Sequence, residues 1–290
     1  MPLDYQLIKN WKFADVEQSY TEKDVILYAL GIGLGQDPLD EKQLDFVYEK
    51  NLKVFPTIGA VLGFPGFWMQ DPKAGITWVK LVHGEQRMRF HKPFPTSGQV
   101  RARIRVTHVI DKGAEKGAIV IVERDIFDMS DDSLLATVQQ TSFLRADGGF
   151  GNGDASPEAL PKVPERAPDH VCTLPTLPQA ALLYRLNADP NPLHVDLQVA
   201  QNAGYPKPIL HGLCTYGVAA HAVVKTLCDY DPTRLTRFDA RFSAPVYPGE
   251  TLAVEIWEGD EGLAHFQAKV VERDIVVLSN GVAQVRSVAL

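Results

Sequence analysis

The chain of 290 residues has few cysteines and no long apolar run. Its three cysteines, Cys172, Cys214 and Cys228, form no Cys-x-x-Cys pair and leave an odd one out. This pattern argues against a disulfide framework and a structural zinc site, and it suits a reducing compartment. No apolar stretch approaches the ~20 residues that a bilayer-spanning helix needs, so we expect no membrane association.

The chain also has fewer basic than acidic residues. The chain has 29 Lys and Arg against 36 Asp and Glu, a formal net charge of −7. A nucleic-acid-binding protein normally shows a basic excess or a basic stripe, and neither is present, so we expect no nucleic-acid partner. The N-terminal residues lack the basic region and apolar core of a secretory signal. The C-terminal residues are not a peroxisomal address of the Ser-Lys-Leu type, so the expected compartment is the cytoplasm, with the peroxisome as the eukaryotic alternative.

Glycine and proline are concentrated in one stretch, from 146 to 178, where four glycines are followed by six prolines. Glycine permits irregular backbone and proline interrupts regular ladders, so the composition predicts a linker. The linker would divide the chain into an N-terminal unit, 1–145, and a C-terminal unit, 179–290.

The two halves carry matching patterns in the same order. Arg89-Phe90 matches Arg241-Phe242 at an offset of 152, and Tyr28-Ala29-Leu30 matches Tyr184-Arg185-Leu186 at an offset of 156. A register shared over this length indicates an internal duplication. Coincidence between short, common motifs is the alternative.

Each half has the same coarse plan, a mixed segment with helical stretches followed by several strands. The runs rich in Val, Ile, Thr and Phe predict strands at Val100–Val109, Ala118–Asp128, Leu134–Leu144, Ala240–Phe242, Thr251–Trp257, Ala264–Glu272 and Asp274–Val285. Pro192–Ala203 is predicted as a short helix and Gly212–Thr226 as a longer, buried one, because it is small and apolar. One buried helix embraced by a curved antiparallel sheet, occurring twice, is an α+β architecture.

The residues best suited to chemistry lie within six positions of one another. Asp189, Asn191 and His194 are held in a loop by Pro190 and Pro192, whose φ angles are fixed. A carboxylate, an amide and an imidazole on a rigid loop can bind and polarise one water. Proton transfer by such groups supplies roughly 10²–10⁴-fold in rate.

Simpler interpretations of this segment compete with the catalytic one. Asn191 or Asp189 could only cap the helix that follows. A calcium loop is excluded, because Leu193 stands where the third oxygen ligand belongs and the required glycine is missing. Cys214 could suggest a thiol nucleophile, but within an apolar helix we expect it to serve packing.

Gly212 follows His211 at the expected start of the longer helix. A helix N-terminus presents unpaired backbone N–H groups and the positive end of the helix dipole. A glycine there lets a ligand oxygen come close to the backbone. This is the arrangement that an oxyanion hole for a thioester carbonyl requires.

The run from Tyr184 to Gly217 closely resembles the hydratase 2 motif of the MaoC-like enoyl-CoA hydratases, and Val82–Gln86 in the first half belongs to the same resemblance. The whole chain is similar to the hydratase 2 domain of the peroxisomal multifunctional enzyme and its stand-alone bacterial relatives. The resemblance implies a double hot-dog fold, with a central helix in each repeat. It also implies a non-catalytic first repeat that accommodates the acyl chain, and Gly33 indeed stands opposite Asp189 at the 156 offset.

The activity implied by the resemblance is the reversible hydration of trans-2-enoyl-CoA to (3R)-3-hydroxyacyl-CoA, in fatty acyl or sterol side-chain metabolism. Asp189, Asn191 and His194 would form the catalytic set, and the Gly212 N–H would contact the thioester oxygen. The family's substrate contacts fall on His83, Gly84, Lys112 and Phe242. Without the resemblance, Lys112 would be taken as a solvated charge and Phe242 as a core residue.

The resemblance implies no metal and no redox cofactor, and it suggests a homodimer. An acyl-CoA thioesterase and a non-catalytic acyl-CoA-binding protein of the same fold remain the alternatives, since fold alone does not decide function. The aromatic stretch Phe64–Met69 could line the acyl-chain space or could form a packed loop; both interpretations stay open.

Overall fold

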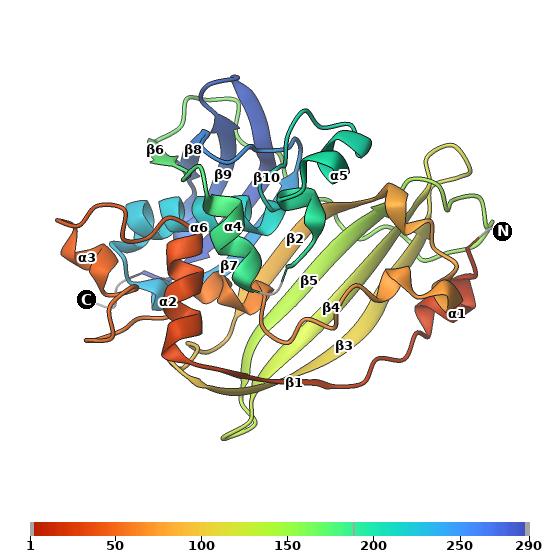
Figure 1. The fold of residues 1–290 in the computed structure, drawn as a ribbon, viewed down its shortest axis with the longest axis horizontal. Coiled ribbons are helices and arrows are strands. Elements are labelled where there is room, and N and C mark those ends of the chain that lie inside the picture. Colours follow the sequence, from red (N-terminus) through yellow and green to blue (C-terminus); the bar gives the residue numbers. More distant parts are fainter. Residues whose placement is uncertain (1–2, 188, 288–290) are drawn as a thin grey trace.

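A single antiparallel sheet runs through the computed structural model, which describes residues 3–187 and 189–287. Its strand order is β1-β3-β4-β5-β2-β7-β10-β9-β8-β6 (Figure 1). The strands are β1 (Val16–Tyr20), β2 (Leu81–Phe90), β3 (Gly98–Asp111), β4 (Ala118–Asp128), β5 (Leu134–Leu144), β6 (His170–Pro175), β7 (Leu235–Phe242), β8 (Thr251–Glu258), β9 (Leu263–Val270) and β10 (Ile275–Val285). Every strand expected from the sequence is confirmed, with ends moved by at most two residues, except that the expected Ala240–Phe242 is only the last part of β7.

The sheet order is symmetric about the contact between β2 and β7. Outward from this contact the first half adds β5, β4, β3 and β1, and the second adds β10, β9, β8 and β6. Arg87 on β2 lies opposite Asp239 on β7, and these positions differ by the repeat offset of 152. Glu85 pairs with Arg241 and Arg89 pairs with Arg237. The offset of 152 relates position 85 to 237 and position 89 to 241, so a twofold axis through the Arg87–Asp239 pair exchanges these two pairs. The internal duplication is thereby confirmed.

Strand β6 corrects the predicted linker. His170–Pro175 lies inside the stretch 146–178 but pairs in full with β8, from His170 opposite Ile256 to Pro175 opposite Thr251. It takes the place beside β8 that β1 takes beside β3. The proline is tolerated because β6 is an edge strand and Pro175 is its last residue. The second repeat therefore begins before His170 and not at 179.

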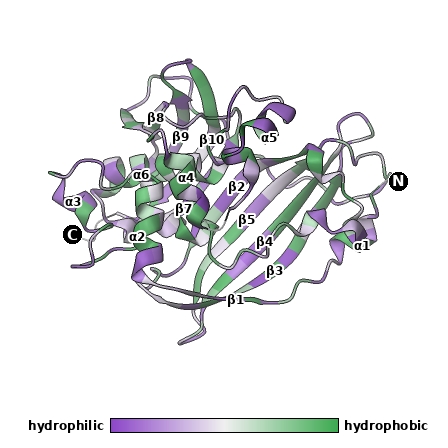
Figure 2. Ribbon diagram, in the orientation of Figure 1, coloured by the Kyte–Doolittle hydropathy of each residue, from purple (hydrophilic) through white to green (hydrophobic). Residues whose placement is uncertain are grey.

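Helix α6 (Gly212–Cys228) is the buried centre of the second repeat and packs against β6, β7, β8 and β10. It is two residues longer than expected and mostly apolar (Figure 2). Small side chains let neighbours come close: a Cβ on Gly217 would lie 2.4 Å from Cγ2 of Ile32. The helix thus forms the core of a hot-dog unit.

Residues 3–145, the described part of the first repeat, form no such helix, and the expectation of one in each repeat is wrong. At the positions that correspond to α6, the chain forms short 3₁₀ turns, η1 (Pro56–Ala60), η2 (Trp68–Gln70) and η3 (Pro72–Ala74), followed by η4 (Trp78–Lys80). Gly63 and Gly66 adopt φ of 62° and 76°, and proline follows at 65 and 72, so a continuous helix is blocked. This segment crosses the broad face of β2, β5, β4 and β3 (Figure 1).

The remaining helices are short: α1 (Tyr5–Lys9), α2 (Glu22–Gly31), α3 (Glu41–Leu44), α4 (Ala180–Tyr184) and α5 (Leu197–Asn202). Helices α2 and α4 lie side by side (Figure 1), and the rings of Tyr28 and Tyr184, which match in the two repeats, are 6.1 Å apart. None of the helices in the described part of the chain is long and apolar enough to cross a membrane.

The helix predicted over Pro192–Ala203 is broken in two. The 3₁₀ turn η6 (Pro192–His194) is followed by α5, which starts afresh after Asp196. The Asp196 carboxylate caps α5 by accepting hydrogen bonds from the N–H groups of Gln198 at 2.8 Å and Val199 at 3.1 Å. The break leaves His194 at the end of its own turn.

Candidate active site

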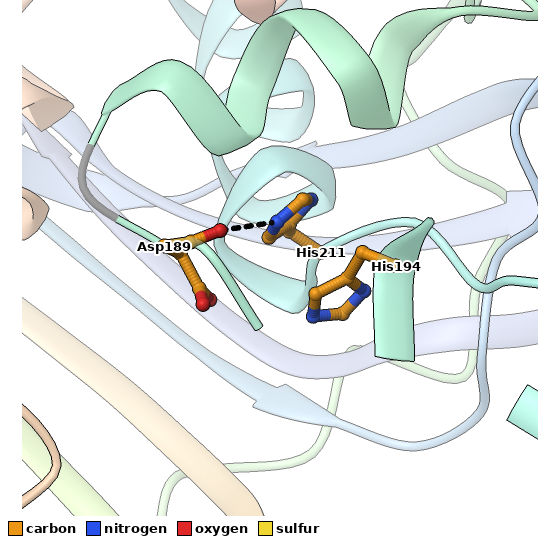
Figure 3. Close-up of side chains that lie close together, drawn as sticks. All are labelled: Asp189, His194 and His211. Carbon is orange, nitrogen blue, oxygen red and sulfur yellow. Dashed lines mark hydrogen bonds between the residues drawn. The ribbon is translucent and has the colours of Figure 1, made fainter. Parts of the chain in front are cut away.

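Asp189, His194 and His211 come together at the N-terminal end of α6 (Figure 3). One carboxylate oxygen and one ring nitrogen from each histidine lie within 4.8 Å of one another. Asp189 and His194 belong to the loop between α4 and α5, and His211 immediately precedes α6. The sequence predicted the first two as a pair, and the structure adds the third.

Local hydrogen bonds shape the loop. Oδ1 of Asp189 accepts from the N–H of Asn191 at 3.2 Å, and Oδ1 of Asn191 accepts from the N–H of Leu193 at 3.0 Å. Asn191 is therefore the N-cap of η6, and Pro192 occupies its first position. The capping alternative holds for Asn191, whose side chain is exposed. Its catalytic role stays a prediction.

His194 is buried and has a defined tautomer. Its Nδ1 lies 2.8 Å from the carbonyl oxygen of Ile209, which can only accept, so Nδ1 carries the proton and Nε2 keeps a lone pair. Burial lowers the pKa of His194 below its ordinary value, although the Ile209 hydrogen bond and the charge of Asp189 act in the opposite direction. The ring is therefore neutral at neutral pH and can accept a hydrogen bond through Nε2.

His211 stacks on His194, with ring centroids 3.7 Å apart and planes 27° from parallel. Its Nε2 donates to the backbone carbonyl of Asp189 at 3.2 Å (Figure 3). Burial, and then the neighbouring His194, lower the pKa of His211 to about 4. The predicted site did not include His211, although its place directly before the helix-starting Gly212 was a usable signal.

The same three residues form a set that could ligate a metal ion, but their arrangement does not favour one. One nitrogen of each ring already bonds a backbone carbonyl. The lone pair of an imidazole nitrogen lies in the ring plane, and two stacked, nearly parallel planes do not direct their lone pairs at one point. The absence of a metal from the mechanism stays a prediction.

Gly212 joins the cluster to the substrate residues expected in the first repeat. The first hydrogen bonds of α6 run from Cys214 and Thr215 to the carbonyl of His211 and leave the Gly212 N–H outside the helix ladder. A Cβ on Gly212 would lie 3.2 Å from Cε1 of Phe242. The Phe242 ring in turn lies 4.6 Å from the ring of His83. Gly212, Phe242 and His83 thus form one wall made from both repeats.

His83 faces the catalytic loop. Burial lowers the pKa of His83 to about 4, and the carbonyl of Glu85, the side chain of Gln86 and the charge of Asp189 partly oppose this effect. Its Nε2 is 3.2 Å from the Glu85 carbonyl oxygen. His83 therefore lies on β2, close enough to the loop of the second repeat to be affected by the charge of Asp189.

Gly84 has a packing requirement of its own. A Cβ at this position would lie 2.2 Å from the ring of Phe143 on the adjacent strand β5. No such distance is tolerated between carbon atoms, so the Phe143 ring that covers this position explains the glycine without a substrate. Its contact with a substrate stays a prediction.

Lys112 stands apart from the other expected site residues. It is exposed in the turn between β3 and β4, where its backbone N–H donates to the Gly117 carbonyl at 3.0 Å. The neighbouring Asp111 carboxylate fixes the turn by accepting from the N–H groups of Gly113, Gly149 and Gly151. No hydrogen bond among residues 3–187 and 189–287 joins Lys112 to the cluster, and its substrate contact stays a prediction.

Cys214 is a packing residue, as expected. Its side chain is fully buried in α6, and Sγ donates to the carbonyl of Gly31 at 3.2 Å. Burial raises the pKa of the thiol far above its ordinary value. A thiol that stays protonated is a poor nucleophile.

A cavity of about 40 Å³, open to solvent on one side, lies in the first repeat where the long helix is missing. The stretch Phe64–Met69 covers it, so these residues line a space instead of closing on themselves. Strands β2, β3, β4 and β5 form its floor, with the side chains of Gln86, Ile104, Val122, Arg124, Val138, Gln140 and Ser142.

Comparison with known families divides the chain in the same way as its sheet. Residues 18–146 match the model described as the MFE-2 hydratase 2 N-terminal domain, and residues 159–280 match the MaoC like domain. A MaoC-like dehydratase from Phytophthora capsici has a similar structure, with a TM-score of 0.86 and 31% identity, covering 98% of this chain and 99% of that one.

Two curated relatives extend over nearly the whole chain. Enoyl-CoA hydratase ChsH3 of Mycobacterium tuberculosis is 41% identical over 284 residues, which is 96% of this chain and 98% of the relative. The peroxisomal enoyl-CoA hydratase 2 of Arabidopsis thaliana is 39% identical and covers 92% and 91%. The chain therefore belongs to the MaoC-like family and, within it, to the two-repeat proteins with an MFE-2 hydratase 2 N-terminal domain.

Proposed function

We propose that this protein catalyses the reversible hydration of trans-2-enoyl-CoA to (3R)-3-hydroxyacyl-CoA. The single observation that carries the proposal is the pairing of the Asp189 carboxylate with a neutral His194 whose Nε2 is free to accept a proton. The similar proteins named enoyl-CoA hydratase support the same reaction class.

The reacting water lies between the two groups. Atoms no more than 4.8 Å apart can hydrogen-bond the same water, since each bond needs about 2.8 Å. Asp189 acts as the principal base and His194 as the water ligand and proton relay. The water loses a proton, its oxygen bonds to C3, and the π electrons of the double bond move toward the thioester. A proton then adds to C2 and the hydroxyacyl product is complete.

Charge that develops on the thioester oxygen is stabilised by the Gly212 N–H. This group lies outside the hydrogen-bond ladder of α6 and at the positive end of the helix dipole. Asn191 caps η6 and thereby holds the loop of Asp189 and His194 at a fixed position relative to this N–H. The acyl chain extends from this point past His83 and Phe242.

The first repeat accommodates the acyl chain. Because it lacks the helix that fills the second repeat, its sheet faces a cavity where α6 would otherwise lie. His83 and Gln86 lie on the same strand, β2, the first beside the catalytic loop and the second in the cavity wall. The chain that we propose for this space is fatty or sterol-derived.

The experiment is a spectrophotometric assay of enoyl-thioester absorbance with crotonyl-CoA, trans-2-decenoyl-CoA and a sterol enoyl-CoA. An (R)-specific dehydrogenase reports the configuration of the product. Loss of absorbance with formation of the (R)-alcohol supports the proposal. Release of free CoA, detected with a thiol reagent, would instead indicate a thioesterase, and tight binding without turnover would indicate a binding protein.

For the assembly we propose a homodimer, and for the compartment the cytoplasm or, in a eukaryotic cell, the peroxisome. One chain already contains both repeats in a continuous sheet, so the catalytic unit does not need a second copy. Sedimentation of the purified protein at several concentrations tests the dimer. A monomer at all concentrations would contradict the proposed homodimer and would leave the proposed reaction unaffected.

A further inference from the structure

Arg124 is a buried charge that the proposed reaction does not use. It lies near the middle of β4, and its side chain is 6% exposed. Its neighbours across the sheet are Ile104 on β3 and Val138 on β5, both in the wall of the cavity. A guanidinium is thus placed on an inner face that is otherwise apolar at these positions.

Its hydrogen bonds leave the charge uncompensated. Nη2 donates to the carbonyl oxygens of Gly59 and Ala60 at 2.9 and 2.8 Å. Nε is buried without a partner, and Nη1 makes no hydrogen bond to the described residues. Neutral carbonyls satisfy two protons of the group but supply no negative charge. A buried cation normally has an anionic partner.

The cavity itself offers no such partner. Of the described residues that line it, Arg124 is the one that carries a charge, and none is acidic. The remaining polar side chains, those of Gln86, Gln140 and Ser142, are neutral hydrogen-bonding groups. The walls over them are apolar and aromatic, and the ring of Phe64 lies 5.8 Å from the Arg124 guanidinium carbon. The cavity therefore combines mostly apolar walls with one cationic side chain.

The position of Arg124 sets it away from the reacting atoms. Strand β5 lies between β2 and β4 and gives a common reference: Ser142 pairs with His83 on β2, and Val138 pairs with Arg124 on β4. These two positions on β5 are four residues apart, or about 13 Å along the strand. A ligand group that meets Arg124 must therefore be at the far end of a chain whose thioester is beside Gly212.

We propose that the first-repeat cavity binds acyl chains that end in a carboxylate, and that Arg124 pairs with this carboxylate through one of its free nitrogens. The inference rests on the proposed hydration and specifies its substrate class, the CoA monoesters of enoyl dicarboxylic acids. Because Nη2 already donates to two carbonyls, the carboxylate accepts from Nη1 or from Nε, which lie on different edges of the guanidinium, and the charge assists this hydrogen bond.

The test compares trans-2-dodecenoyl-CoA with its analogue that carries a carboxylate at the far end. Steady-state kcat/KM is measured for the native protein, for Arg124→Gln, and for Arg105→Gln as the matched control, since Arg105 is an exposed arginine on β3 paired with Asp125. We expect Arg124→Gln to lose roughly 10- to 100-fold on the carboxylated substrate alone, because a charge-assisted pair is removed. Equal losses on both substrates would show that Arg124 only braces Gly59 and Ala60, and would overturn the inference.

A second measurement does not depend on turnover or on the folding of a variant. The binding of saturated dodecanoyl-CoA and of its carboxylated analogue to the native protein is followed by tryptophan fluorescence, since Trp68 lines the cavity. Tighter binding of the carboxylated ligand supports the inference, and equal or weaker binding overturns it. Absence of hydration with both enoyl substrates would count against the proposed function, and the binding result would still decide the role of Arg124.

Discussion

The rings of His194 and His211 stack at 3.7 Å between centroids, and each ring bonds a backbone carbonyl through one nitrogen. The two carbonyls, of Ile209 and of Asp189, fix which nitrogen of each ring carries the proton. Two imidazoles this close repel when both are charged, and both are also buried. The pair is therefore held neutral, with Nε2 of His194 facing the space beside Asp189.

This arrangement predicts the acid limb of the pH profile. Because the pKa of His194 is lowered from 6.5, the neutral ring persists below that pH and is lost only on further acidification. We expect kcat/KM for enoyl-CoA hydration to be level near pH 7 and to fall only below pH 6.5. A profile of kcat/KM against pH measures this. An acid limb centred above pH 7 would show that His194 is protonated in the working enzyme.

His211 is expected to act as a positioning residue. His211→Phe keeps a stacked ring but removes the hydrogen bond to the Asp189 carbonyl, so the loop loses a restraint. We expect kcat to fall about tenfold with little change in KM, because roughly 1.4 kcal/mol of positioning is lost in the transition state. Unchanged kcat in a folded variant would assign His211 to packing alone.

Gly84→Ala is expected to destabilise the first repeat. The added Cβ would meet the ring of Phe143, and overpacking of this kind costs about 1–3 kcal/mol. Urea unfolding of Gly84→Ala measures the cost, and Gly98→Ala is the control, since its nearest neighbour, Cε1 of Tyr20, is 4.0 Å away. The double variant with Phe143→Leu should recover part of the loss. Equal stability of the two glycine variants would contradict the packing argument.

The contact between the repeats depends on Asp239. Its fully buried carboxylate accepts from Arg89 at 2.6 Å, from Arg237 at 2.7 Å and from the N–H of Met88 at 3.2 Å. Asp239→Asn removes the charge that both arginines face, and we expect a loss of about 1–3 kcal/mol in the free energy of unfolding.

Asp131→Asn is the matched control for this variant. Asp131 pairs with Lys92 at 2.6 Å, but both side chains are about half exposed, so this pair contributes little. Denaturant unfolding of the two variants should therefore differ clearly. A similar, small effect of both would mean that the β2–β7 contact is stabilised by its backbone ladder and apolar side chains.

Much of the fold could be predicted because its signals are local. Ala118–Asp128 and Leu134–Leu144 were predicted with their observed bounds, since β-branched residues and turn residues mark such strands. The repeat offset that related Arg89 to Arg241 anticipated the symmetric sheet. The edge strand His170–Pro175 was missed because the prolines on both sides of it, and Pro175 at its end, indicate a linker when the neighbouring β8 is not known.

The missing helix of the first repeat shows where analogy between repeats fails. The duplication predicted two central helices, but glycine and proline between Gly63 and Pro72 override it. Asp189 and His194 were found from their spacing in one loop. His211 and Arg124 were not, because their significance depends on a ring stacked on His194 and on a cavity, and both are tertiary contacts.

The most direct test of the central claim is the enoyl-thioester assay on three variants of the catalytic loop, with stereochemistry read by an (R)-specific dehydrogenase. Asp189→Asn and His194→Gln should each lower kcat/KM by roughly 10²–10⁴-fold while the melting temperature stays unchanged. Asp196→Asn, a neighbouring carboxylate replaced by an equally good helix cap, should leave the rate unchanged. Near-normal formation of the (R)-alcohol by Asp189→Asn or His194→Gln would contradict the account.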